Sequence, residues 1–409
     1  MSILNERQRL EVYKNLVTTT NNKFVDPQMN GVDWLRIAKE TEDGIVHSAT
    51  SEDFERLTNE LLQRLGTSHI GFFHGDRPKS PGRIAISATF LSADTADGLR
   101  WMFQDVHPGG MASNAGLEPG DTLLRLNGVE VVPPNAASFA LAADHSLEIR
   151  RRNGSTTKIT ISIPPSQDKK RPLVIPNKVV TSRTLDRGIG YLRVSMFPGV
   201  LGMDVARDIS RAIAELDVSK LVIDLRGNTG GGIGCLRLMS ILSAGRLGVG
   251  YTLGRKQIER NTQKEELPAF ERIPSSKWEV IPLLFRFGMA GRAVAVFSES
   301  LGPAKHHGNV AVLVNEHSAS ASEMVAAFAS EYKLAQLVGT ATPGKVVAAS
   351  SFKVGHGYRV ALPVGSYFTW HGTKLEGRGI APNVHVPTLP EDLLEGNDAP
   401  LKRAIEALR

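Results

Sequence analysis

The chain has 409 residues, of which 41% are hydrophobic and 22% charged, and a formal net charge of +6 with a pI near 9.3. This length exceeds one ordinary domain and predicts two or three domains of globular composition. No stretch approaches the roughly 18 uninterrupted apolar residues of a membrane span. The single cysteine, Cys235, excludes an intramolecular disulfide and a cysteine-built metal site.

The positive charge does not indicate nucleic-acid binding. Basic residues are spread along the chain, with short clusters only at 150–152 and 169–171, and no aromatic-rich basic strand accompanies them. We therefore interpret the charge as solvated surface and expect no nucleic-acid partner. The opening residues mix charges of both signs and lack an apolar segment, so they predict no export signal and favour the cytoplasm, unless a signal segment has been removed.

The first 75 residues predict helices. Thr50 to Asp53 resemble a capping box, and apolar residues follow at helical spacing until Gly66. Short strands and turns follow from about 82 to 165, with Asn127-Gly128 as a hairpin turn. A polar, proline-bearing stretch over 164–176 is typical of a linker.

From about residue 179 strands and helices alternate. Strands are predicted over 220–224, 309–314 and 335–339, and helices over 236–242 and 320–332. This succession predicts an α/β domain with a largely parallel sheet. Residues 250–305 show no clean period, and we interpret them as an excursion from that core.

The loop 315–323, NEHSASASE, joins a buried strand to a helix. Amides at a helix N-terminus favour a developing anion, so a serine placed there could attack a carbonyl group. The same small residues also suit an ordinary helix cap, and this run alone does not decide between the two. A glycine-rich turn at 227–232 could supply further amides, or could cradle a phosphate, although it lacks the lysine of a P-loop.

A serine hydroxyl needs a base. Lys345, followed by apolar residues 346–349, could serve if burial lowered its pKa by about three units from about 10.4. Alone, it would be taken for a surface lysine in a turn. Among the histidines, His317 lies on the loop of the candidate serine, which disfavours a base geometry, and His69 is expected to hydrogen-bond locally rather than to catalyse. No metal-binding spacing is present.

Together these segments resemble the C-terminal processing, or tail-specific, proteases, which are Ser/Lys peptidases with a PDZ domain. The resemblance rests on LGTSH at 65–69, AGLEPGD at 115–121, DLRGNTGG at 224–231 and GIAPNV at 379–384. It implies a multidomain α/β protein without a cofactor. Its expected parts are an N-terminal helical segment at 1–75, a PDZ-like β-rich domain at 76–165, a linker at 166–178, a crotonase-like (ClpP/crotonase) peptidase core at 179–390 and a C-terminal helix or tail at 391–409.

Carried over from the family, the middle serine of the SASAS run is the nucleophile, which is Ser320. The base is the lysine of a turn 25 residues further on, which falls on Lys345. The oxyanion amides would be those of Gly230 and Ala321. The resemblance implies an endopeptidase that acts on polypeptides through an acyl-enzyme. The sequence leaves the oligomeric state open, a homo-oligomer included, and relatives in this family are often exported.

The chain departs from the family pattern at three places. The glutamine that often follows the lysine by four residues is Ala349, the Phe-Gly-Lys-Gly turn reads PGKV at 343–346, and the glycine-rich loop that grips a peptide carboxylate is replaced by AISATF at 85–90. A non-catalytic peptide-binding protein on the same fold therefore stays open as an alternative. An acyl-CoA enzyme on a crotonase-like core has no residue signature in its favour.

Overall fold

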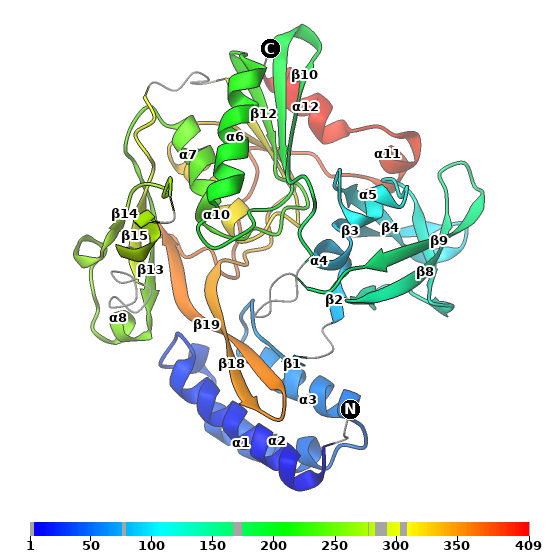
Figure 1. Cartoon of the computed structure of the whole chain (residues 1–409), viewed down its shortest axis with the longest axis vertical. Helices are drawn as coiled ribbons and strands as arrows, with labels where there is room; N and C mark the ends of the chain where they lie inside the picture. The colour runs from blue at the N-terminus through cyan, green and yellow to red at the C-terminus, as the bar shows by residue number, and fades with distance from the viewer. Residues whose placement is uncertain are drawn as a thin grey trace.

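The computed structural model describes residues 4–75, 79–166, 174–276, 278–282, 293–302 and 309–408. Most of the predicted linker, the basic cluster at 169–171 and the histidine pair at 306–307 lie outside these ranges. Within them the chain forms an α/β core, a β-rich domain to one side of it and a helical unit below, and a long hairpin of the core reaches down to the helices (Figure 1). The predicted multidomain α/β fold is confirmed.

The core is built on a mostly parallel sheet with the order β10-β11-β12-β16-β17-β20, in which only β10 and β11 pair antiparallel. Its central strand β16 is buried along its whole length, because helices cover both faces. The helices α6, α7 and α10 pack on one face and α12 on the other. The bounds are β10 (Val180–Leu185), β11 (Ile189–Val194), β12 (Lys220–Asp224), β16 (Val310–Val314), β17 (Gln336–Gly339), β20 (Val384–His385), α6 (Met203–Leu216), α7 (Leu236–Leu242), α10 (Ala321–Glu331), α11 (Pro390–Glu395) and α12 (Ala399–Ala407).

A second sheet contains strands from the region interpreted above as an excursion. That interpretation was wrong for 250–254, 269–270 and 294–297, since these residues belong to three strands of the sheet. The strands are short and far apart in the sequence, so their period-2 pattern is too brief to recognise. The long strand of this sheet is β19 (Tyr358–Thr369). Its other strands are β1 (Gly71–His74), β13 (Gly248–Gly254), β14 (Ala269–Phe270), β15 (Val294–Phe297) and β18 (Val347–Gly355), and the helix α8 (Arg255–Glu259) follows β13.

The β-rich domain has the sheet order β3-β4-β5-β8-β9, with β6 paired to β5 and a separate β2–β7 pair. The predicted hairpin turn is confirmed: Asn127 and Gly128 have φ of 53° and 80° and join β5 to β6. The bounds are β2 (Lys79–Pro81), α4 (Gly82–Ala85), β3 (Ala88–Thr95), β4 (Gly98–Val106), α5 (Met111–Asn114), β5 (Thr122–Leu126), β6 (Val129–Glu130), β7 (Ser138–Ala140), β8 (Ala143–Arg150) and β9 (Thr156–Ile163).

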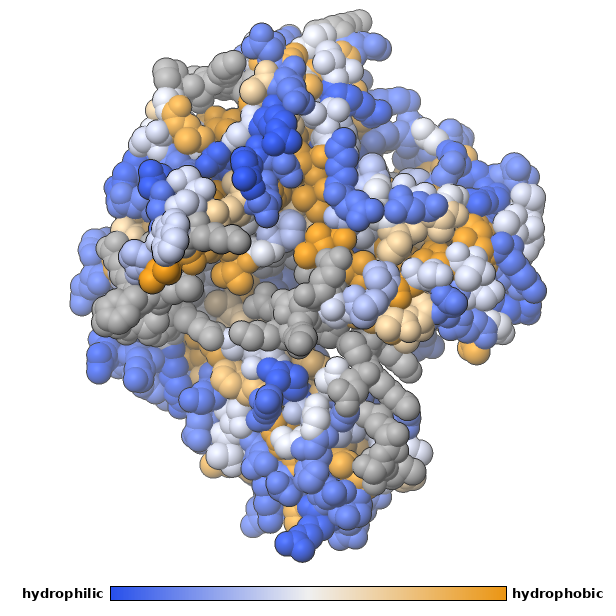
Figure 2. Space-filling view, in the orientation of Figure 1, coloured by the Kyte–Doolittle hydropathy of each residue, from blue (hydrophilic) through white to orange (hydrophobic). Residues whose placement is uncertain are grey.

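The N-terminal helices are α1 (Glu6–Lys23), α2 (Trp34–Val46) and α3 (Ser51–Gln63), and Thr50 caps α3 by accepting from the Asp53 amide, as predicted. They share one hydrophobic cluster with β1, β18 and β19. None of the helices in the described part of the chain combines the length and the apolar character that a membrane crossing requires. On the face shown in Figure 2, hydrophilic side chains predominate over these helices.

An aromatic group joins the helical unit to the hairpin. Phe72 on β1 stacks on Tyr358 with 4.8 Å between ring centroids and meets Phe54 of α3 edge-on at 5.5 Å. We expect Phe72→Ala to lower the free energy of unfolding by about 3–5 kcal/mol, because a buried ring leaves a cavity. Leu35→Ala on α2, whose side chain is 58% exposed, should change it by less than about 0.5 kcal/mol. Chemical denaturation measures both, and equal losses would contradict this account.

Candidate active site

Three loops meet at the carboxyl edge of the parallel sheet. β12, β16 and β17 are neighbours, so the segments that follow them leave the sheet side by side. These segments are 225–232, 315–320 and 340–346. They hold the glycine-rich turn, the serine run and the lysine, so the topology brings the three sequence-predicted segments to one place.

Ser320 occupies an unusual backbone conformation at the start of α10. Its φ of 56° and ψ of −115° lie outside the helical region, whereas Ala321 begins the helix. A side chain at Gly230 would place its Cβ 2.7 Å from the Ser320 Cβ and 2.7 Å from the Ala321 nitrogen. Only glycine therefore fits at position 230, and the glycine-rich turn presses directly against the serine.

A buried carboxylate ties the serine loop to the lysine loop. Glu323 in the first turn of α10 is fully buried and accepts from the Ser320 amide at 2.9 Å and from the Lys345 amide at 2.8 Å. It also accepts from the Gly344 amide and the Thr342 hydroxyl, at 2.7 and 2.8 Å. Burial raises the pKa of Glu323, and these donors oppose that rise. The carboxylate thus fixes two loops that the sequence separates by more than twenty residues.

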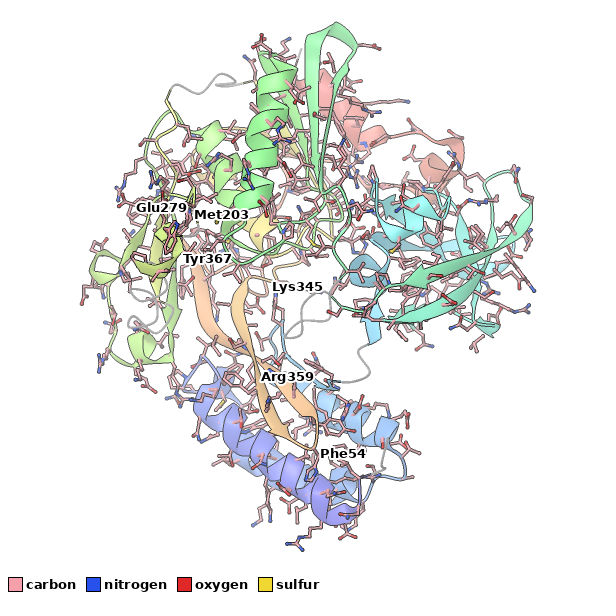
Figure 3. All side chains as sticks on the ribbon, viewed as in Figure 1. Phe54, Met203, Glu279, Lys345, Arg359 and Tyr367 are labelled. Atoms are coloured by element: carbon pink, nitrogen blue, oxygen red, sulfur yellow. The ribbon has the colours of Figure 1, made fainter. Side chains whose placement is uncertain are left out.

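Lys345 lies where the hairpin β18–β19 leaves the core (Figure 3). Its side chain is partly buried, and burial together with the positive charge of Arg83 lowers its pKa. The carboxylates of Glu323 and Glu376 act in the opposite direction. A lowered pKa is the direction that a general base of this type requires. Ala349, which replaces the family glutamine, lies on β18 just beyond.

The two backbone amides predicted for an oxyanion hole, those of Gly230 and Ala321, differ in their hydrogen bonding. The Ala321 amide is the first of α10 and lies against Gly230. The Gly230 amide donates to Asn228 Oδ1 at 2.8 Å, so it would have to leave that acceptor before binding an oxyanion. Asn228 is fully buried, and its carbonyl oxygen accepts from the Ala319 amide at 2.9 Å, which ties the turn to the serine loop.

A further segment, the turn that contains Ser68 and His69, contacts the site from the N-terminal part of the chain. Glu376 accepts from the Ser68 amide at 2.6 Å and the Ser68 hydroxyl at 3.1 Å, and also from the Val346 amide at 2.8 Å, next to Lys345. His69 Nδ1 lies 2.7 Å from the Ser68 oxygen. The Ser68 oxygen thus contacts both the Glu376 carboxylate and the His69 ring, and these contacts orient the imidazole.

The local hydrogen bond predicted for His69 is therefore confirmed, but its link to Glu376 was missed. The partners are separated by 308 residues, and the only signal in the sequence was the LGTSH motif itself. His317 turns away from this arrangement, since its Nε2 contacts the Phe90 carbonyl oxygen at 3.2 Å. Among the described residues, no group of three or more His, Cys, Asp or Glu side chains could hold a metal ion.

Comparison with known proteins agrees with this architecture. Residues 188–386 match the sequence model of peptidase family S41, and residues 102–151 match that of a PDZ domain. The chain is thus similar to peptidase family S41 over the core that carries the candidate site. The resemblance to the C-terminal processing proteases, and the PDZ domain predicted from the sequence, are thereby confirmed.

Curated relatives share about a quarter of their aligned residues with this chain. A tricorn protease homolog of Streptomyces coelicolor is 25% identical over 93% of this chain and 30% of its own length. A carboxyl-terminal-processing protease of Picosynechococcus sp. is 24% identical over 69% of this chain and 60% of its own length. This chain thus spans between about a third and two thirds of these relatives.

Solved structures share the fold of this chain. Mature CPAF in complex with lactacystin has a TM-score of 0.61 at 15% identity, with 98% of each chain covered. The photosystem II D1 C-terminal processing protease has a TM-score of 0.54 at 17% identity, with 94% of each chain covered. At 15–17% sequence identity, this similarity shows a shared fold and nothing further.

We expect Glu323→Ala to lower kcat by roughly 100-fold, because two site loops lose their common acceptor and a shift of about 1 Å can cost that much. Glu331→Ala removes the same group from the other end of α10 and serves as the control. Steady-state kinetics on a peptide substrate, with thermal unfolding alongside, measures the effect. Equal kcat values for the two variants would show that Glu323 does not hold the site.

Proposed function

We propose that this chain is a serine-type endopeptidase that hydrolyses peptide bonds through an acyl-enzyme on Ser320. The observation that carries the proposal is the position of Ser320, at positive φ in the N-cap position of a buried helix and pressed against Gly230. A half-buried hydroxyl beside helix N-terminal amides suits attack on a carbonyl group. The match of residues 188–386 to the model of peptidase family S41 supports the same activity.

In this proposal Lys345 is the general base. Its neutral amine takes the proton of the Ser320 hydroxyl as Oγ bonds to the scissile carbonyl carbon. It then gives that proton to the leaving amine as the peptide C–N bond breaks. A water molecule, deprotonated in the same way, cleaves the ester and restores the hydroxyl. The Ala321 amide stabilises the oxyanion, and the Gly230 amide joins it once released from Asn228.

The hydrogen-bond chain at His69 favours a second candidate for the base. The Glu376 carboxylate accepts from the Ser68 hydroxyl, whose oxygen contacts His69 Nδ1, so a polar chain orients the imidazole. The histidine base of a serine peptidase is held by a polar partner at Nδ1 in the same way. Because Glu376 also holds the amide next to Lys345, both candidates belong to one connected arrangement.

The PDZ domain is proposed to bind or gate the polypeptide. The segment 85–90, which lacks the glycines of a carboxylate-gripping loop, runs from α4 into β3. Addition of an extended peptide to a strand of this domain needs no such loop. A non-catalytic peptide-binding protein on the same fold is the alternative, and it predicts peptide binding without cleavage.

We expect Ser320→Ala to lower kcat on a denatured protein or labelled peptide by roughly 10⁴-fold or more. Lys345→Met should do the same if lysine is the base, while His69→Gln retains most of the activity. The reverse result would assign the base to His69. Cleavage that persists in Ser320→Ala would refute the nucleophile. Binding without cleavage by the unmodified protein would favour the peptide-binding alternative.

The pH dependence offers an independent test of the base. Activity that needs neutral Lys345 rises with pH through the lysine pKa, which the charge of Arg83 lowers. Arg83→Met should therefore raise that pKa and move the ascending limb of the kcat profile to higher pH. Arg125→Met, at an exposed site in the same domain, is the control. If the limb stays in place in Arg83→Met, Lys345 is not the titrating base.

A further inference from the structure

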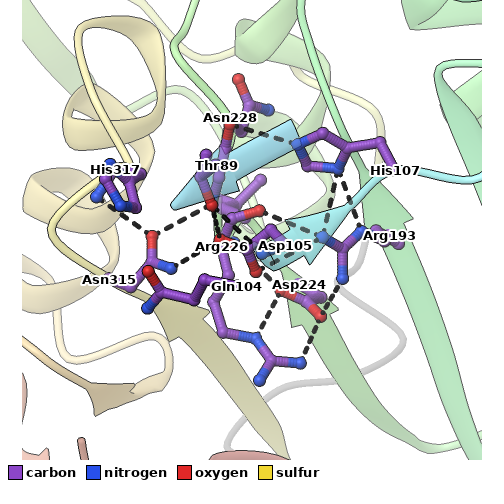
Figure 4. Close-up of polar contacts among 12 residues, drawn as sticks. Thr89, Gln104, Asp105, His107, Arg193, Asp224, Arg226, Asn228, Asn315 and His317 are labelled. Atoms are coloured by element: carbon purple, nitrogen blue, oxygen red, sulfur yellow. Dashed lines mark hydrogen bonds and ion pairs between the residues drawn. The ribbon is translucent and has the colours of Figure 1, made fainter. Parts of the chain in front are cut away.

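The PDZ domain and the core meet through buried polar groups (Figure 4). On the PDZ side these groups come from the paired strands β3 and β4 and from the residue after β4, and on the core side from β11 and from the ends of β12 and β16. The PDZ residues that reach the core are Phe90, Gln104, Asp105 and His107, and Thr89 donates to Asp105. The core segments that they reach are the glycine-rich turn and the loop before Ser320, which are two of the three loops of the candidate site.

Asp105 is the centre of one set of contacts. It is 6% exposed, accepts from the Thr89 hydroxyl at 2.7 Å and accepts from the Asn315 side-chain amide at 2.9 Å. Asn315 in turn accepts the Gly227 amide at 3.0 Å and the His317 amide at 3.1 Å on its Oδ1. One asparagine therefore connects a PDZ carboxylate to both active-site loops.

His107 holds the same turn from the other side. Its Nδ1 accepts from Arg193 at 3.1 Å, so its Nε2 carries the proton and donates to the Gly227 carbonyl oxygen at 3.2 Å. Burial and the Arg193 charge lower its pKa to about 4, which keeps the ring neutral. Gly227 has a φ of 72°, and a Cβ there would lie 2.8 Å from the His107 ring. The His107 ring of the PDZ domain therefore packs so closely against Gly227 that a side chain at position 227 would clash with it.

Two further contacts hold the serine loop from the PDZ side. The Gln104 side-chain amide donates to Glu316 at 2.7 Å, and the other oxygen of Glu316 accepts from Thr340 in the lysine loop at 2.6 Å. The Phe90 carbonyl oxygen contacts His317. Every residue from 315 to 317 therefore has a partner in the PDZ domain.

Buried charges on the two sides of the domain interface compensate one another. The buried guanidinium of Arg193 contacts Asp224 at 3.0 Å and lies 3.7 Å from Asp105. Burial alone would raise the pKa of Asp105, but the charges of Arg193 and Arg226 outweigh it and hold the pKa below its ordinary value. Removing one member of such a cluster leaves an uncompensated buried charge, which is strongly destabilising. Loss of PDZ docking therefore disturbs the loops that share its partners.

We propose that the PDZ domain is a working part of the active site, in which Asp105 acts as a positioning residue that holds the Gly227 turn and the serine loop in register through Asn315. This inference rests on the proposed function for its catalytic readout only. It assigns the PDZ domain a role in forming the site, separate from any role in binding substrate.

The test compares Asp105→Asn with Asp94→Asn, an exposed aspartate on β3 of the same domain. On a short peptide substrate, Asp105→Asn should lower kcat roughly 10- to 100-fold and change KM by less than about 2-fold, since the loops shift while the substrate contacts remain. Asp94→Asn should leave both constants unchanged. The double variant D105N/N315D exchanges the two side chains: the amide of residue 105 can then donate to one carboxylate oxygen of residue 315 while the other accepts the Gly227 amide, so part of the lost kcat should return.

Hydrogen exchange supplies a readout that does not depend on activity. In Asp105→Asn the amides of 226–231 and 315–322 should exchange several-fold faster than in Asp94→Asn, while those of α6 are unchanged. Unaltered exchange in both segments would overturn the inference, as would a kcat equal to that of the control. Faster exchange in a protein whose unmodified form cleaves nothing would refute the proposed peptidase and leave the coupling standing.

Discussion

Parallel pairing of β12, β16 and β17 is the constraint on which the candidate site depends. Parallel strands in register release their following loops at one edge, so residues far apart in the chain become neighbours without any specific attraction between them. Buried backbone donors in these loops need acceptors within the protein. The carboxylates of Glu323 and Glu376 and the carbonyl oxygen of Asn228 meet this need, each accepting a main-chain amide from a segment distant in sequence.

The sequence predicted what local pattern determines. The strand over 220–224, the helix over 236–242 and the cap at Thr50 were found because apolar period and capping chemistry act within a few residues. Long-range partners were not predictable: nothing near Glu323 in the chain indicates that its carboxylate would bind the Lys345 amide. The strands within 248–297 were missed for a related reason. β13 pairs with the long β19, β15 with β13 and β14 with β15, so pairing across the sheet stabilises segments too short to carry a pattern.

The domain interface shows how one buried charge requires others. Asp224 lies at the end of a buried strand and is fully buried, where an isolated carboxylate would be costly. It accepts from Tyr191, Arg193 and Arg226, and the two guanidinium groups then need counter-charges beyond Asp224. Asp105 supplies one from the PDZ domain. Sequence reasoning treated the segment at 224–231 as a glycine-rich turn, because the charges that complete it lie in other parts of the chain.

Arg226 receives its remaining counter-charge from Asp398, at 2.7 and 2.9 Å, and Asp398 is also the N-cap of α12. This contact joins the glycine-rich turn to the last helix described. A chain being synthesised from its N-terminus reaches Asp398 only after the serine, the lysine and the PDZ domain have been made. The turn beside Ser320 thus stays without part of its charge balance until α12 has been synthesised. A nascent chain would therefore carry every proposed catalytic group before it carried a fully supported site.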